Sequence, residues 1–409
     1  MELNEIKQKL EKYNQSHLLK FYDQLDDNQK EKLLNSISSI DFDKINSLYL
    51  KKDEQIKHDL VEPLAYIDRL KLRSKEIEHY KKIGEDIIKS NEYGFVTMAG
   101  GQGTRLGHSG PKGTYKLGIN PDKSLFEIMS DSLKQAKKDY GVYITWYIMT
   151  SRENNQDTID FFKANNYFGY PKEDIIFFKQ SEIPMLDVNG KILLENKYTI
   201  REAADGHGGV FEAMNKNNIL DDMKRRNIKW VFVGGIDNVL LKMVDPIFLG
   251  MAEEKGVLIA SKSVVKANPF EKVGVFCKKN GKPSVIEYTE ITDDMANMVD
   301  DEGELLYGES HILCNLFNIK ALEIIKNEKL PYHTAFKKSK YIDENGNEIV
   351  PLAPNSYKFE TFIFDAFSKV DDMLILRCVR EEEFAPVKNK EGEDSPETAR
   401  RLYNNFFNK

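Results

Sequence analysis

The chain has 409 residues, of which 41% are apolar and 31% are charged. This length and composition are typical of a globular protein with two or three domains and a large apolar core. The formal net charge of −7 at pH 7 argues against nucleic acid or an anionic membrane as the main partner, so any basic surface would have to be local.

The number of cysteines and the hydropathy of the sequence indicate where in the cell the protein is expected. The cysteines Cys277, Cys314 and Cys378 are widely spaced and odd in number, which argues against a disulfide framework and against a CxxC metal site. The sequence contains no apolar run of about 18 residues, the length that a membrane span requires. The first residues are charged and lack the apolar segment of a secretion signal. We therefore expect a cytoplasmic protein.

Residues 1–92 are predicted to form a helical N-terminal region. Apolar residues such as Leu33, Leu34, Ile37 and Ile40 recur there at helical spacing, and we expect three or more amphipathic helices. We interpret this region as a cap over one face of the next domain. The alternative is a lid or a docking module.

A pattern of strands alternating with helices begins at about residue 93. The predicted strands are 95–98, 142–149, 175–178 and 230–233, and the predicted helices are 124–138, 156–165 and 214–226. This alternation predicts an α/β fold with a Rossmann-like mixed sheet, mostly parallel and flanked by helices.

Two Asn-Gly pairs predict hairpins in the C-terminal half. Asn280-Gly281 and Asn345-Gly346 each separate segments of strand-like pattern, and we expect both hairpins as antiparallel additions over the sheet edge. Residues 358–370 are predicted to form a helix, residues 373–379 a strand, and residues 395–409 a final helix.

The most informative stretch is residues 95–118, FVTMAGGQGTRLGHSGPKGTYKLG. A short apolar strand breaks into a glycine-rich loop with Arg105 and Lys112, and glycine backbone beside fixed positive charge suits a polyphosphate. A dinucleotide fingerprint needs GxGxxG, but Gly107 comes one place late, and the Walker A pattern is absent. The loop instead has the nucleotidyltransferase form GGxGTRLG followed by PKG. A purely structural turn would need neither the Arg nor the Pro-Lys pair.

Three polar features follow directly after predicted strands: the glycine loop, Gln180 and Asp237. In open parallel sheets, ligands bind outside the carboxyl ends of the strands. We therefore expect these features to meet at one edge of the sheet, although they are far apart in sequence.

An ordered series of motifs carries a family resemblance. The motifs are residues 98–107, 111–113, 147–151, 177–180, 205–209, 236–238, 273–275, 287–290, 315, 358, 362–365 and 380–388. Across residues 93–400 the chain resembles the eukaryotic-type UDP-N-acetylhexosamine pyrophosphorylases, of the UTP:sugar-1-phosphate uridylyltransferase family. The resemblance implies a GT-A-like nucleotide-diphospho-sugar transferase fold. We assign residues 93–390 to the catalytic domain and residues 391–409 to a short C-terminal helix.

The resemblance implies that UTP and a sugar 1-phosphate give a UDP-sugar and pyrophosphate, with a sugar phosphate oxygen attacking the α-phosphorus in line. Positioning and charge neutralisation carry such a reaction. Arg105, Lys112 and Lys388 are the implied catalytic cations: the first two act on the triphosphate, and Lys388 acts on the sugar 1-phosphate or the α-phosphate. Lys358 is also expected on the phosphates of UTP. The alternative for a lone lysine is a solvated surface residue.

The other UTP-binding residues follow from the same resemblance. Gln180 can pair its amide with the uracil edge, and Gly206 lets backbone approach the base. Asp237 is the implied ligand of Mg²⁺, the expected cofactor. Its alternative role is a helix N-cap acid before Asn238. The base and ribose are expected to lie against Met98, Ala99, Gly100 and Gly101.

Further positions match the family's sugar-binding residues: His207, Gly274, Glu287, Asn315, Phe362, Phe364 and Lys388. Glu287 has Glu290 as a nearby competitor, and strand alternation could equally place Glu287 on a solvent face. Phe362 and Phe364 would flank an N-acetyl methyl group, although their periodicity alone favours ordinary core positions.

Two observations disagree about the sugar. His207 stands where N-acetylhexosamine enzymes usually carry Asn and where UDP-glucose and broad UDP-sugar pyrophosphorylases carry His, whereas loop residues 102–107 follow the N-acetylhexosamine pattern. We predict formation of a UDP-N-acetylhexosamine, with UDP-N-acetylglucosamine preferred. UDP-glucose or broad UDP-sugar formation is the first alternative.

Two rival classes are disfavoured. A non-catalytic nucleotide-sugar sensor would not need the intact cations, and an NAD(P)-dependent enzyme would need a better fingerprint. Longer relatives continue past the position of Arg400, so we carry over no oligomeric state from them and expect a monomer.

Overall fold

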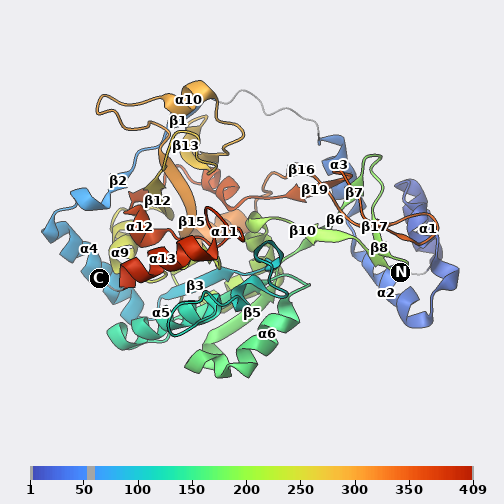
Figure 1. Cartoon of the computed structure of the whole chain (residues 1–409), viewed down its shortest axis with the longest axis horizontal. Coiled ribbons are helices and arrows are strands. Elements are labelled where there is room, and N and C mark those ends of the chain that lie inside the picture. Colours follow the sequence, from blue (N-terminus) through green and yellow to red (C-terminus); the bar gives the residue numbers. More distant parts are fainter. Residues whose placement is uncertain (1–2, 53–59, 408–409) are drawn as a thin grey trace. The chain divides into compact units, whose positions relative to one another are not determined.

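The computed structural model describes residues 3–52 and 60–407, which form two compact units (Figure 1). Within these residues, unit 1 consists of 3–52, Ser181–Gly209 and Leu330–Phe362, and unit 2 consists of 60–180, Val210–Lys329 and 363–407. None of the helices in this part of the chain has the length and apolar character that crossing a bilayer requires.

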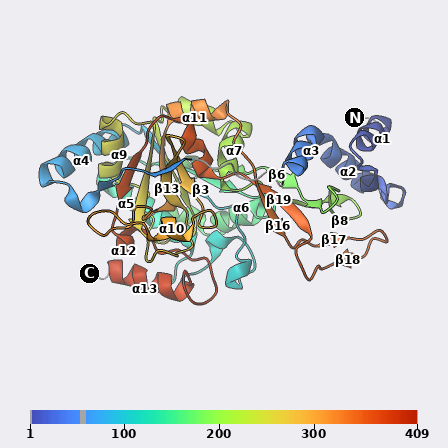
Figure 2. The same ribbon diagram turned by 90° about the horizontal axis from the view of Figure 1, so that it is seen from above.

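Unit 2 is built on an eleven-stranded mixed sheet (Figures 1 and 2). Its main path runs β2-β20-β12-β15-β11-β3-β4-β5, and every adjacent pair is parallel except the two made by β15. The hairpin β13–β14 joins through β15, and β1 pairs with β13. The strands are β1 (Val61–Pro63), β2 (Ile67–Asp68), β3 (Tyr93–Met98), β4 (Thr145–Thr150), β5 (Ile175–Lys179), β11 (Trp230–Gly235), β12 (Ile259–Val265), β13 (Val275–Lys279), β14 (Lys282–Ile286), β15 (Glu309–Asn318) and β20 (Leu374–Arg377).

Helices cover both faces of this sheet. On β15, Cys314 and Leu316 join the core cluster that contains Phe126 of α5, whereas Phe317 points the other way and its ring meets Phe211 of α7 edge-on. The helices of unit 2 are α4 (Ser74–Lys89), α5 (Leu125–Tyr140), α6 (Asn155–Ala164), α7 (Val210–Lys216), α8 (Ile219–Arg225), α9 (Pro246–Glu254), α10 (Asp293–Asn297), α11 (Ile319–Lys326), α12 (Arg380–Glu383) and α13 (Pro396–Phe407). The predicted α/β fold with a largely parallel central sheet is confirmed.

Local sequence explains where α5 begins and ends. The Ser124 hydroxyl accepts the backbone N–H of Glu127, which supplies a partner that the first turn otherwise lacks. Gly141 ends the helix with a φ of 79°, a conformation that favours glycine. Both signals are contained in the sequence, and the predicted helix 124–138 is close to the observed one.

Two glycines let α4 pack directly on α9. A side chain at Gly84 would collide with the backbone of Pro246, and one at Gly250 would collide with the backbone of Tyr80. Close backbone approach therefore holds α4 in unit 2. As a result, the residues predicted as one helical region, 1–92, contribute helices to both units.

Unit 1 combines the helices α1 (Leu3–Lys12), α2 (Asp27–Ser39) and α3 (Phe42–Leu50) with short antiparallel strands. Its core joins helical residues such as Leu33 and Ile37 to Leu186 and Phe359 on strands. The strands are β6 (Glu182–Pro184), β7 (Leu186–Asp187), β8 (Leu194–Asn196), β9 (Thr199–Ile200), β10 (Glu202–Ala204), β16 (His333–Lys337), β17 (Tyr341–Ile342), β18 (Glu348–Ile349) and β19 (Ser356–Glu360).

The structure corrects three expectations. The helix predicted over 358–370 is wrong, because residues 356–360 form β19, which pairs with β16 and β7, and only Ile363–Lys369 is helical, as a 3-10 helix. The helix predicted over 214–226 is interrupted at Asn218, whose φ is 56°. The Asn345-Gly346 hairpin, β17–β18, lies in unit 1 and is not an addition to the large sheet, whereas the Asn280-Gly281 hairpin is joined to that sheet as predicted.

Candidate active site

The carboxyl ends of β3, β4, β5 and β11 form the edge that the sequence pointed to. Backbone hydrogen bonds continue past the strand ends: Ala99 N–H donates to the Met149 carbonyl (2.8 Å), Gln180 N–H to that of Thr150 (2.8 Å), and Ile236 N–H to that of Met98 (3.2 Å). These bonds bring the glycine loop, Gln180 and the Ile236–Asp237 turn to one side of unit 2. The predicted convergence is confirmed.

The glycine loop is closed by its own backbone. Lys112 N–H donates to the Gly101 carbonyl (3.0 Å), and Gly103 N–H donates to the Gly110 carbonyl (2.9 Å). A side chain at Gly113 would overlap the ring of Phe126, so this glycine lets the loop pack on α5. The loop is thus a rigid platform in which Met98 and Ala99 are buried and Gly101 is exposed.

Gly100 and Gln180 are in direct apposition. A Cβ at Gly100 would lie 3.0 Å from Gln180 Cδ and closer still to Oε1. The absence of a side chain at Gly100 therefore allows the Gln180 amide to lie over the first turn of the loop, where both a donor and an acceptor are presented.

Asn154 is a site-supporting residue that the sequence analysis missed. Its buried amide donates to the carbonyls of Ala99 (2.9 Å) and Gly101 (3.3 Å), while its Oδ1 accepts the N–H of Ser151 (2.8 Å). The Ser151 hydroxyl in turn accepts the N–H of Asn154 (3.2 Å). This reciprocal Ser-x-x-Asn pattern just before α6 was a readable signal, because such side chains bond neighbouring backbone groups at helix starts.

The charged groups gather at Asp237. Lys112 Nζ lies 3.5 Å from Asp237 Oδ2. Burial opposes ionisation of this carboxyl, but the positive charges of Lys112 and Lys388 hold the pKa of Asp237 below its ordinary value. Asp237 is in a turn after β11 and not at a helix start, so the N-cap alternative is wrong.

Lys388 reaches this edge through a backbone connection between distant segments. Val387 N–H donates to the Asp237 carbonyl (2.8 Å), and Val239 N–H donates to the Ala385 carbonyl (3.2 Å). The Lys388 side chain is 40% exposed, and its Nζ lies 3.4 Å from Asp394 Oδ2. Two lysines that are distant in sequence thus lie near one carboxylate.

Arg105 differs from the two lysines. It lies on the short 3-10 helix Thr104–Leu106, its side chain is exposed, and its guanidinium has no hydrogen bond or ion pair among residues 3–52 and 60–407. An uncommitted cation on a rigid loop can bind an anionic ligand without first breaking an internal pair.

Gly274, Glu287 and Asn315 lie in the neighbourhood of β13–β15. The Glu287 carboxylate lies over Gly274, where a Cβ would be 3.4 Å from its Oε1. Asn315 is fully buried, and its Oδ1 accepts a hydrogen bond from Ser261 Oγ (2.8 Å). Its Nδ2 has no partner among the residues that the structure describes, and a buried donor of this kind suits a ligand acceptor.

Glu290 and Phe364 have structural partners. Glu290 Oε2 accepts the N–H of Glu287 (2.9 Å) and lies 3.4 Å from Lys279 Nζ. Phe364 is buried, with its ring edge-on to His311, as the ordinary core reading expected.

The remaining predicted residues, Gly206, His207, Lys358 and Phe362, belong to unit 1. Gly206 has a φ of 86° and a side chain there would collide with the backbone of Thr361, so glycine is required. The rings of His207 and Phe362 stack at 5.3 Å. Lys358 Nζ pairs with Glu360 Oε1 at 2.6 Å, so Lys358 is not a simple solvated lysine.

The comparisons with known proteins agree on the class. Residues 40–393 match the family described as UTP–glucose-1-phosphate uridylyltransferase. The UDP-N-acetylglucosamine pyrophosphorylase of Saccharomyces cerevisiae is 35% identical over 98% of this chain and 89% of its own. UDP-N-acetylglucosamine diphosphorylase 2 of Arabidopsis thaliana is 36% identical over 97% of this chain and 82% of its own.

A solved structure extends this agreement to the fold. The uridine diphosphate N-acetylglucosamine pyrophosphorylase of Trypanosoma brucei superposes with a TM-score of 0.84 at 32% identity, covering 97% of this chain and 83% of its own. The chain belongs to the UTP–glucose-1-phosphate uridylyltransferase family, and the resemblance to its UDP-N-acetylhexosamine pyrophosphorylases is confirmed. The family match begins at residue 40, well before the motifs that start near residue 93.

Proposed function

We propose that this protein transfers uridylyl from UTP to an N-acetylhexosamine 1-phosphate, with N-acetylglucosamine 1-phosphate preferred. A phosphate oxygen of the sugar 1-phosphate bonds to the α-phosphorus, and the bond from that phosphorus to the bridging oxygen of the β-phosphate breaks, which releases pyrophosphate. The observation that carries the proposal is the placement of Lys112 and Lys388 near Asp237 at the strand edge, beside a glycine loop whose Arg105 has no partner among the described residues.

The three cations have distinct proposed roles. Arg105 and Lys112 stabilise the charge that grows on the leaving pyrophosphate, and Lys388 orients the phosphate of the sugar against the α-phosphorus. Such chemistry needs positioned positive charge more than covalent participation by the protein. Lys388 would exchange its partner Asp394 for a phosphate oxygen, and two ion pairs with exposed groups are close in energy.

The donor set at Asp237 fits Mg²⁺. A magnesium ion in nucleotide-transfer sites is usually bound by one or two carboxylates together with substrate phosphates and water. No cluster of three His, Cys, Asp or Glu occurs among residues 3–52 and 60–407, so the single ionised Asp237 would share the ion with UTP. When bound, the ion would neutralise phosphate charge.

Gln180 is the proposed reader of uracil, with Met98 to Gly101 against the base and ribose. In unit 1, Gly206 and Lys358 are proposed for UTP, and His207 and Phe362 for the sugar. In unit 2, Gly274, Glu287, Asn315 and Phe364 are proposed for the sugar. The Nδ2 of Asn315, which has no hydrogen-bond partner in the part of the chain that the structure describes, supports this assignment.

A second candidate is formation of UDP-glucose or several UDP-sugars. His207 favours it, because histidine at this position resembles enzymes of that kind. Replacement His207→Asn should then raise the ratio of N-acetylglucosamine 1-phosphate to glucose 1-phosphate turnover, and an unchanged ratio would remove His207 from the argument.

The deciding experiment measures the release of pyrophosphate from UTP in the presence of Mg²⁺. It is run with each of four sugar substrates: the 1-phosphates of N-acetylglucosamine, N-acetylgalactosamine, glucose and galactose. Release with N-acetylglucosamine 1-phosphate well above glucose 1-phosphate is expected. Higher turnover of glucose 1-phosphate would select the second candidate, and no release with any sugar would leave only a nucleotide-sugar sensor. We further propose that the protein is a cytoplasmic monomer with a GT-A-like fold. Cell fractionation can test the location, and light scattering can test the oligomeric state.

A further inference from the structure

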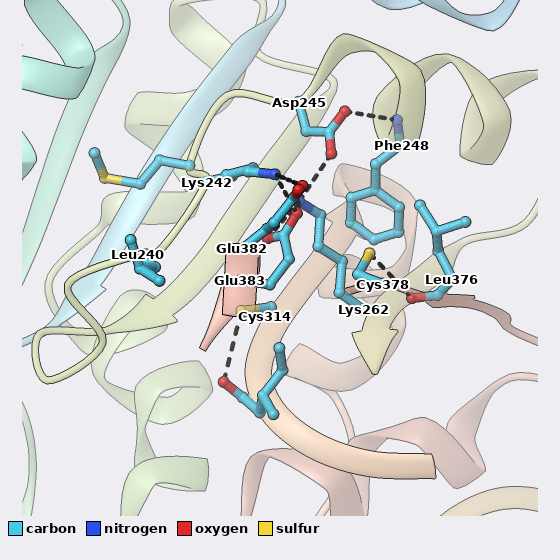
Figure 3. A network of polar contacts seen from close by, with 12 residues as sticks. Leu240, Lys242, Asp245, Phe248, Lys262, Cys314, Leu376, Cys378, Glu382 and Glu383 are labelled. Carbon is cyan, nitrogen blue, oxygen red and sulfur yellow. Dashed lines mark hydrogen bonds and ion pairs between the residues drawn. The ribbon is translucent and has the colours of Figure 1, made fainter. Parts of the chain in front are cut away.

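Unit 2 contains a buried network of charged side chains (Figure 3). Lys262 on β12 is fully buried, and its Nζ lies 2.8 Å from Asp245 Oδ2 and 3.1 Å from Glu383 Oε2. Asp245 also pairs with Arg69 (2.6 Å), and Glu383 with Lys242 (3.2 Å). These contacts leave every buried charge in the network paired.

The surrounding charges favour the charged forms of Lys262 and Asp245. Burial opposes the charge on Lys262, but Asp245 and Glu383 raise the pKa of Lys262 above its ordinary value. Likewise, Lys262 and Arg69 lower the pKa of Asp245 despite its burial. Buried ion pairs of this kind are poor stabilisers, since apolar residues of similar volume often do as well, but they can fix one arrangement of the segments that carry them.

The segment fixed here carries Lys388. The Glu383 side chain is held by Lys262, while the Glu383 carbonyl accepts Asn238 Nδ2 (2.6 Å) and Asn238 Oδ1 accepts the N–H of Ala385 (2.9 Å). One residue before Asn238, the Asp237 carbonyl accepts the N–H of Val387 (2.8 Å). The path therefore runs without a break from the buried lysine to the turn of Asp237 and to the residue before Lys388.

We propose that Lys262 and Glu383 are positioning residues for uridylyl transfer. Their buried ion pair holds residues 384–388 in register with the Asp237 turn through Asn238, and so sets Lys388 near Asp237, which also pairs with Lys112. Neither residue touches the reacting atoms. This inference rests on the proposed function, since it concerns the step that Lys388 and Asp237 serve.

Glu383→Gln and Asn238→Ala test the two ends of the connection. Glu383→Gln keeps the volume and one oxygen but removes the charge, and Asn238→Ala removes the link between the two segments. Each should lower kcat about 10- to 100-fold, the range expected when reacting groups are misplaced by about 1 Å. The KM for UTP should stay within about threefold, because uracil and triphosphate binding by the glycine loop is unchanged.

Arg377 and Glu309 supply a matched control. They form a second buried ion pair in the same sheet, with Arg377 Nε 2.7 Å from Glu309 Oε1, between β20 and β15 and without a bond to residues 384–388. The variant Glu309→Gln, which like Glu383→Gln removes one carboxylate charge from a buried ion pair, should lower the melting temperature to a similar extent, yet keep kcat per folded protein within about threefold of the wild type.

The double variant Asn238→Ala/Glu383→Gln separates a shared path from two independent effects. If both residues act by holding residues 384–388 against the Asp237 turn, the double variant should lose no more kcat than the worse single variant. If their effects are independent, the two losses in kcat should multiply. Multiplied losses, a Glu383→Gln variant with wild-type kcat, or an equal loss in the control would each overturn the inference. If Glu383→Gln does not fold, Asn238→Ala alone must still show the split between kcat and KM. The wild type is assayed first. If it releases no pyrophosphate, the proposed function is wrong, and this outcome is distinct from a failure of the inference about Lys262 and Glu383.

Discussion

Gly100→Ala is the sharpest test of how this site reads its nucleotide. The added Cβ would lie 3.0 Å from Gln180 Cδ and nearer to Oε1, whereas ordinary contact begins at 3.4 Å, and the next neighbour, Ser151 N, is at that distance. The backbone at Gly100 does not have a positive φ, so alanine adds no backbone strain. The substitution should therefore displace the Gln180 amide and leave the rest of the loop in place.

The size of the effect follows from hydrogen-bond geometry. A retreat of about 1 Å stretches a normal hydrogen bond beyond its useful length. The Gln180 amide can make two such bonds to uracil, each of which contributes about 1 kcal/mol. Losing both amounts to about 2 kcal/mol, or roughly a 30-fold loss in the preference for UTP over CTP.

The assay compares kcat/KM for UTP and CTP in the wild type and the variant. Gly101→Ala is the matched comparison, because a Cβ there meets nothing within 4 Å, and it should keep the UTP to CTP ratio whatever happens to the rate. A Gly100→Ala variant with the wild-type ratio would show that Gln180 does not read the base.

Three further outcomes are expected. Arg105→Ala should lower kcat about 100- to 1000-fold with no change in melting temperature, because the guanidinium has no partner among the described residues; wild-type turnover would refute its phosphate role. Gly250→Ala should destabilise the fold by about 1–3 kcal/mol, since a Cβ there collides with the backbone of Tyr80; an unchanged urea midpoint would contradict the close packing of α4 on α9. His17 hydrogen-bonds to the Ile192 carbonyl (2.8 Å), and burial lowers the pKa of its imidazole. The unfolded state therefore binds a proton more readily than the folded state does. As a result, stability is lost as the pH falls below about 6.5. His17→Gln should make the free energy of unfolding less dependent on pH between 7 and 5, and an equal slope would exclude His17 as the cause.

Local chemistry explains which parts of the fold the sequence predicted well. The strand of Phe95 and the helix after Ser124 depend on an apolar run and a capping hydroxyl, which act over a few residues. The Asn280-Gly281 turn is equally local, because both residues adopt positive φ values that asparagine and glycine tolerate. By contrast, residues 358–370 have an apolar pattern that suits either a helix or a strand, and pairing with β16 decided in favour of a strand up to Glu360.

The sequence by itself determined the glycine loop, its cations and the strand ends at which they had to meet, because loop chemistry and parallel topology need no long-range information. Only the tertiary structure showed that a side chain at Gly100 would displace the Gln180 amide, that Asn154 hydrogen-bonds to the loop, and that the segment of Lys388 is bonded to the Asp237 turn. It also showed that Lys262 and Glu383 are buried partners although they are 121 positions apart. Sequence analysis assigns a charged residue to the surface unless its partner is known. Whether a charge can be buried depends on partners that only the whole fold brings together.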